Sequence, residues 1–151
     1  MTGNKFAKSF IETISAVLVF LFLYTGLSKY LSFHTFEFTI SKSVIINKHA
    51  YIVALFLPGI EIITTILLTV PRTRLLGLYA SIGLLFSFTS YLIYMVNYAP
   101  QLPCSCGGII QQLSWTQHII LNITLLVATT IAISLYRRKN IKFFKNQGSI
   151  V

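Results

Sequence analysis

Residues 75–96, LLGLYASIGLLFSFTSYLIYMV, contain no Asp, Glu, Lys or Arg. A helix of about 20 mainly apolar residues is long enough to cross a hydrocarbon core of roughly 30 Å. Three further runs have this length and character, at about residues 10–30, 50–70 and 114–136. The sequence therefore predicts four transmembrane helices.

The composition supports a membrane protein, since 55% of the residues are hydrophobic and only 10% are charged. A soluble domain usually has about 25% charged residues. Four spans leave little of the 151 residues for anything else, so we expect one domain over residues 1–151, an all-α four-helix transmembrane bundle. Residues 31–49, between the first two spans, are too polar to cross the membrane. We expect this segment on the outer interface, as a short surface helix or an extended strand.

The formal charge of +9 follows the membrane and does not indicate nucleic acid. If both termini are cytoplasmic, nine basic residues lie inside and three lie outside, as the positive-inside rule requires. The inner nine are Lys5, Lys8, Arg72, Arg74, Arg137, Arg138, Lys139, Lys142 and Lys145, and the outer three are Lys29, Lys42 and Lys48. This topology places residues 97–113 outside, where disulfides persist. The first span has no small-x-small cleavage site after it, so we expect it to be retained.

Both cysteines of the chain, Cys104 and Cys106, lie in residues 103–108 (PCSCGG). A bridge between them closes almost no loop and adds little stability. It is also strained, and a strained disulfide is readily reduced by an incoming dithiol. The pair is therefore a candidate redox-active site, the alternative being two unpaired small residues in a loop.

The start of the fourth span carries polar residues at helical spacing, Ser114, His118 and Asn122. Such a stripe is expected to face the bundle interior rather than lipid. His118 is placed to stabilise a thiolate or to relay its proton, although a histidine that only hydrogen-bonds between helices remains an alternative. Trp115 is expected at interface depth. Residues 114–117 (SWTQ) fit a capping box that predicts where the last helix begins.

Glu61 lies about eleven residues into the second span, near mid-membrane. A carboxylate there must be protonated, paired or facing a polar cavity, which makes it a candidate functional residue as well as a candidate packing residue. Pro58 is expected to kink the helix and open a pocket. Four residues on other helices are possible partners of Glu61, namely Tyr24, Lys29, Tyr91 and Tyr94.

Three smaller expectations concern the end of the bundle that carries the termini. Residues 71–74 (PRTR) predict a tight turn between antiparallel second and third helices. Glu12 is expected to pair with Arg72 or Arg74. Residues 137–139 (RRK) form a basic stop after the last span, and residues 140–151 are expected to be unstructured or lipid-facing.

The chain resembles the MauE branch of the DoxX-like membrane proteins over nearly its whole length. The matching elements are residues 24–29 (YTGLSK), Phe36, residues 57–61 (LPGIE), residues 103–108 (PCSCGG), residues 114–118 (SWTQH) and Asn122. The resemblance implies a four-helix protein of the bacterial inner membrane. In methylamine utilisation, such a protein acts with a thioredoxin-like partner to mature the disulfide-rich small subunit of methylamine dehydrogenase.

Together these observations predict a membrane thiol-disulfide oxidoreductase. Cys104 and Cys106 exchange disulfides with a thioredoxin-like partner or client outside the cytoplasm, through a mixed disulfide. A membrane quinone bound near Glu61, Trp115, His118 and Asn122 is a possible electron acceptor.

Two alternatives stay open. One is a membrane scaffold without enzymatic activity. The other is a metal-handling protein that uses Cys104, Cys106 and His118 with His34 or His49 as soft ligands.

Overall fold

The computed structural model describes residues 2–41, 47–98 and 115–147. All regular structure in these ranges is helical. The elements are α1 (Thr2–Leu31), α2 (Phe33–Ser41), the short 3-10 helix η1 (Asn47–His49), α3 (Ala50–Thr69), α4 (Arg74–Tyr98) and α5 (Trp115–Gln147). The helices α1, α3, α4 and α5 are long and apolar enough to cross a membrane. The predicted all-α bundle of four transmembrane helices is confirmed.

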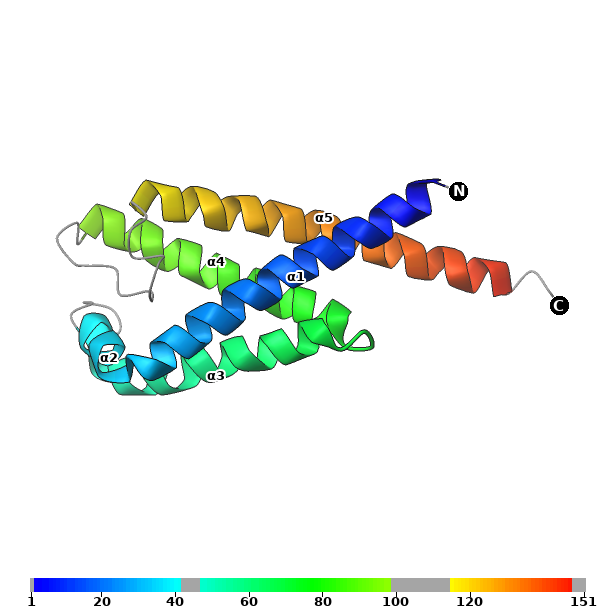
Figure 1. Cartoon of the computed structure of the whole chain (residues 1–151). Helices are drawn as coiled ribbons and strands as arrows, with labels where there is room; N and C mark the ends of the chain where they lie inside the picture. Colours follow the sequence, from blue (N-terminus) through cyan, green and yellow to red (C-terminus); the bar gives the residue numbers. More distant parts are fainter. Residues whose placement is uncertain (1, 42–46, 99–114, 148–151) are drawn as a thin grey trace.

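The four long helices form one bundle in which α1 crosses the others obliquely (Figure 1). α1 packs chiefly on α3, α4 packs on α5, and α3 and α4 are antiparallel neighbours. The N-terminus, the turn between α3 and α4 and the end of α5 share one end of the bundle, and α2 lies at the other (Figure 1). The Tyr136 hydroxyl of α5 donates to the Pro71 carbonyl at 3.4 Å. The basic residues near the two termini and in the turn therefore lie at a common end.

The core is built from aliphatic and aromatic side chains of all four long helices. Its buried members are Leu18, Phe22, Leu68, Leu78, Leu84, Leu85, Leu125 and Ile133. The outward faces are also apolar, and Phe20, Phe56 and Phe86 are each more than 60% exposed. Such a surface suits lipid, because the bilayer solvates apolar side chains while each helix satisfies its own backbone hydrogen bonds.

The turn between α3 and α4 brings the two helices into backbone contact, as residues 71–74 predicted. The Thr73 hydroxyl donates to the Leu67 carbonyl at 3.1 Å, and the Val70 amide donates to the Ile66 carbonyl at 3.1 Å. A Cβ atom on Gly77 would stand only 2.8 Å from the Leu68 backbone nitrogen. Glycine at this position therefore permits the close approach of α4 to the end of α3.

The segment after α1 contains a helix, one of the two forms expected for it. Phe36 and Ile40 of α2 are buried and pack against Ala50 and Ala54 at the start of α3. Helical spacing of apolar residues thus decided between the helical and extended alternatives.

One expectation for the end that carries the termini is wrong, and one of two alternatives for another does not hold. Glu12 pairs with Lys8, at 3.9 Å between Nζ and Oε1, and not with an arginine of the turn. Lys8 lies one helical turn away on the same face, so the pair needs no tertiary contact. In addition, residues 140–147 are not unstructured, because α5 continues through them; the lipid-facing alternative stays a prediction. No Gly or Pro occurs between residues 115 and 147, and Lys and Arg are good helix formers, so nothing in the basic segment stops the helix.

Candidate functional site

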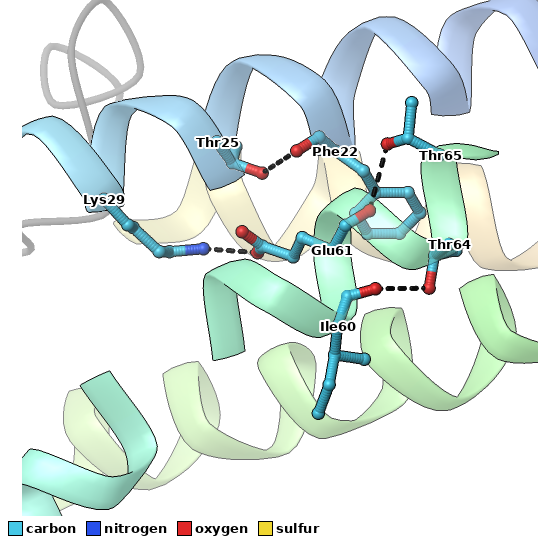
Figure 2. A network of polar contacts seen from close by, with 7 residues as sticks. All are labelled: Phe22, Thr25, Lys29, Ile60, Glu61, Thr64 and Thr65. Carbon is cyan, nitrogen blue, oxygen red and sulfur yellow. Dashed lines mark hydrogen bonds and ion pairs between the residues drawn. The ribbon is translucent and has the colours of Figure 1, made fainter. Parts of the chain in front are cut away.

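A buried ion pair joins α1 to α3 in the apolar part of the bundle. The Lys29 Nζ donates to Glu61 Oε1, and the side chains are 4% and 0% exposed (Figure 2). Of the four partners considered for Glu61 from the sequence, Lys29 is the one that forms the ion pair. Each charge is stabilised by the other, which offsets part of the cost of placing either one alone in this environment.

A glycine of α1 allows this contact. A Cβ atom on Gly26 would stand 3.3 Å from Glu61 Cβ and Oε2, and 3.4 Å from the Pro58 carbonyl. Thr25 lies beside the same carboxylate (Figure 2). Pro58 lies inside α3, which nevertheless runs unbroken from Ala50 to Thr69. Gly26 therefore makes the room that lets α1 approach α3 at the carboxylate.

The Lys29 ammonium also contacts two aromatic rings on other helices. Its Nζ lies 4.6 Å from the ring centroid of Phe88 on α4 and 5.7 Å from that of Phe36 on α2. Both distances fall within the range of a cation–π interaction. Lys29 of α1 thus interacts with α2, α3 and α4 at once.

A cavity of about 60 Å³ lies between α1, α4 and α5. Its lining is mostly apolar and includes Phe22, Leu85 and Phe88. The polar part of the lining consists of Thr25, Lys29, Tyr91, His118 and Asn122. No residue of α3 lines this cavity, so Glu61 approaches it only through its partner Lys29.

His118 is buried in this cavity wall without a hydrogen-bond partner. It is the fourth residue of α5 and is 6% exposed, and neither Nδ1 nor Nε2 meets a partner among the described residues. His118 and Asn122 both line the cavity, so the expectation that this stripe faces the bundle holds for these two residues. Ser114 and the side chain of Trp115 lie outside the described part of the chain.

The cysteine pair lies outside the described residues, within residues 99–114. This segment connects Tyr98 at the end of α4 to Trp115 at the start of α5, two helices that pack side by side. His118 is therefore one helical turn from the point where the cysteine segment enters α5. The redox assignment of Cys104 and Cys106 stays a prediction.

Within residues 2–41, 47–98 and 115–147, no group of three or more His, Cys, Asp and Glu side chains is placed to hold a metal ion. His34 and His49, the histidines named for a metal site, are both exposed. The metal alternative needs Cys104 and Cys106, so it also stays a prediction.

Lys29 is more important to the site than the sequence indicated, where it was an outer basic residue and one of four possible partners of Glu61. Two features of the sequence point to it. It is the only basic residue in the predicted span 10–30, and Gly26 precedes it by three residues, on the same helical face.

The chain matches the family described as methylamine utilisation protein MauE over residues 7–136. No curated protein matches the chain, and no solved structure does. The matched region contains Lys29, Glu61, both cysteines and His118. The family resemblance noted from the sequence is confirmed at this level, and the wider DoxX-like grouping stays a prediction. With its four membrane-spanning helices, the chain is a multi-pass membrane protein that belongs to the methylamine utilisation protein MauE family.

Proposed function

We propose that this protein is a membrane thiol-disulfide oxidoreductase that serves methylamine utilisation. Cys104 and Cys106 exchange disulfides with a thioredoxin-like protein or a disulfide-containing client outside the cytoplasm. One observation carries the proposal: both cysteines of the chain lie two residues apart in the link between α4 and α5. A pair with almost no loop to close is suited to exchange rather than to stabilisation.

The exchange proceeds through a mixed disulfide. A thiolate of the partner attacks one sulfur of the Cys104–Cys106 bridge, the S–S bond breaks, and the other cysteine leaves as a thiolate. The second partner thiol then displaces the first cysteine, so the partner is oxidised by two electrons and the pair is reduced by two. His118, with both ring nitrogens unpaired among the described residues, supports the proposal as a base for the attacking thiol.

The charge distribution supports an orientation for this chemistry. The termini and the α3–α4 turn share one end of the bundle (Figure 1), and this end carries Lys5, Lys8, Arg72 and Arg74. By the positive-inside rule it faces the cytoplasm. The cysteine segment then lies on the outer face of a bacterial inner membrane, where disulfides persist.

Trapping the mixed disulfide tests the proposal. With Cys104→Ala and Cys106→Ala expressed separately in the native host, one variant is expected to accumulate a covalent adduct. Its remaining thiolate attacks the disulfide of the oxidised partner, one partner sulfur leaves as a thiolate, and no second cysteine is present to resolve the mixed disulfide. The adduct should disappear under reducing conditions, and mass spectrometry should identify a thioredoxin-like protein or a secreted disulfide-containing protein. The double variant Cys104→Ser/Cys106→Ser is the matched control and should form none.

Two results would overturn the proposal. One is the absence of an adduct from both single variants at wild-type expression levels, which favours the scaffold. The other is labelling of the cysteines by a maleimide that reaches them only from the cytoplasm.

A further inference from the structure

The cavity between α1, α4 and α5 combines an apolar lining with a polar group that lacks a partner. His118 is 6% exposed and lines the cavity, and both its ring nitrogens lack hydrogen bonds within the described residues. A buried polar group of this kind normally has a partner in the protein, a water or a ligand. The cavity volume of about 60 Å³ exceeds the roughly 10–15 Å³ that a single water requires.

Lys29 supplies a second hydrogen-bond donor to the same cavity. Its ammonium has three N–H bonds, of which one is directed to Glu61. The position of Nζ is fixed by this carboxylate on one side and by the ring of Phe88 at 4.6 Å on the other. Since Lys29 and Phe88 both line the cavity, the remaining N–H groups are available near a bound molecule.

The charge of the site indicates a neutral ligand. Glu61 already balances Lys29, so the cavity has no net positive charge to attract an anion. An alkyl chain would leave His118 unpaired, which is costly in an apolar environment. A neutral molecule with acceptor oxygens satisfies both donors, and the aromatic side chains of Phe22, Phe88 and Tyr91 suit a flat ring.

We propose that this cavity binds the ring of a lipid-soluble quinone, with one carbonyl oxygen accepting a hydrogen bond from His118 and another from Lys29. Identifying the ligand as a quinone rests on the proposed function, because a thiol pair needs a two-electron acceptor to become a disulfide again. Oxidation of the Cys104 and Cys106 thiols breaks two S–H bonds and forms one S–S bond. The two electrons and two protons convert the quinone carbonyls to the hydroxyls of the quinol.

Glu61 is a positioning residue in this site. It does not line the cavity, and it acts by holding Lys29 beside Phe88. The sequence predicted that Glu61 lies next to the bound quinone. In this proposal Glu61 instead positions Lys29, and Lys29 contacts the quinone.

Fluorescence of the single tryptophan provides a binding assay. Trp115 is the first residue of α5, one helical turn before His118, and quinones quench indole fluorescence at short range. Titration of the purified full-length protein in detergent with a short-tailed benzoquinone is expected to give saturable quenching. The variant Cys104→Ser/Cys106→Ser should bind equally well, because it keeps both proposed hydrogen-bond donors, His118 and Lys29.

Substitutions at the two donors should weaken binding by about tenfold each, the loss expected for one buried hydrogen bond. His118→Leu removes one donor, and His118→Gln, which keeps a donor, should bind more tightly than His118→Leu. Lys29→Met combined with Glu61→Gln removes the other donor without leaving a lone charge. Thr129→Val is the matched control, because Thr129 is a fully buried polar residue of α5 that does not line the cavity.

The proposal is overturned by quenching that does not saturate, by equal affinity of wild type and His118→Leu, or by displacement of the quinone by a long-chain alcohol at equal concentration. The last result would identify a lipid site. Failure of the cysteine trapping experiment together with saturable, His118-dependent quenching would overturn the thiol-disulfide function and leave the binding site standing. A trapped adduct together with quenching that is not saturable or does not depend on His118 would overturn the quinone site and leave the thiol-disulfide function standing.

Discussion

The buried polar groups on the two sides of α1 differ in whether they have a partner. Toward α3, the charges of Lys29 and Glu61 are buried and meet each other through Glu61 Oε1, while Glu61 Oε2 has no hydrogen-bond partner among the described residues. Toward α4 and α5, His118 is buried to a similar extent and meets no hydrogen-bond partner among the described residues, beside a cavity. The first side therefore holds a charged contact that joins two helices, and the second holds an imidazole of which neither nitrogen is paired.

Lys29 belongs to both sides. It forms the ion pair with Glu61 and also lines the cavity that contains His118. The ion pair therefore fixes the position of one residue in the wall of the cavity. Substitutions on the two sides should have opposite effects on stability, which makes the comparison testable.

The largest effect is expected from Lys29→Met, which leaves the Glu61 carboxylate buried without its partner. Loss of one member of a buried pair lowers the free energy of unfolding by about 3–5 kcal/mol. The double variant Lys29→Met/Glu61→Gln should recover most of this loss, because no charge then remains in the bundle interior at this position. Denaturant unfolding in detergent, followed by far-ultraviolet circular dichroism, measures both. Equal stability of Lys29→Met and wild type would contradict the burial of the pair.

A smaller loss, about 1–3 kcal/mol, is expected from Gly26→Ala, because overpacking a close contact is destabilising. The new methyl group would stand 3.3 Å from Glu61 Cβ and push α1 away from α3. Gly59→Ala is the matched control, since a Cβ atom there meets nothing within 4 Å. Alanine at position 59 should be neutral or stabilising by up to about 1 kcal/mol. Thermal unfolding of the two variants in the same detergent compares them directly, and an equal loss in both would show that the α1–α3 approach does not depend on Gly26.

The smallest expected effect is an increase in the free energy of unfolding, not a decrease. His118→Leu replaces an unpaired buried imidazole by an apolar side chain, so the free energy of unfolding of the ligand-free protein should rise by about 1–2 kcal/mol. Thr129→Val, by contrast, removes a hydroxyl that donates to the Leu125 carbonyl at 2.6 Å and should lower stability slightly. A loss of stability in His118→Leu would mean that the imidazole is satisfied in the free protein. Such a result would remove the distinction between the two sides of α1.

The spans were predictable because a bilayer permits few solutions for the backbone, so long uncharged runs must be helices. The depth of Glu61 in its span also marked it as a residue that needs a partner. The sequence did not show which of the four candidate residues is the partner of Glu61. Lys29 lies near the end of α1 and Glu61 lies in the middle of α3, and only the oblique crossing of the two helices brings them together.

The helices that line the cavity could not be predicted from the sequence for a related reason. Helical spacing indicated that His118 and Asn122 face the interior, but it gave no information about which helices stand opposite them. The structure places α1 and α4 there and keeps α3 out of the lining. At the other end of the bundle, the expectation for Glu12 failed because a local contact with Lys8 was available.

The length of α5 has a consequence for how the protein sits in its bilayer. Its 33 residues measure about 50 Å at 1.5 Å per residue, against a hydrocarbon thickness of roughly 30 Å. The surplus of some 20 Å falls in the segment that carries Arg137, Arg138, Lys139, Lys142 and Lys145. Anionic lipid headgroups attract each such residue by about 1 kcal/mol. We expect this attraction to limit how far the helix shifts along the membrane normal, and therefore to set the depth of the imidazole near its opposite end.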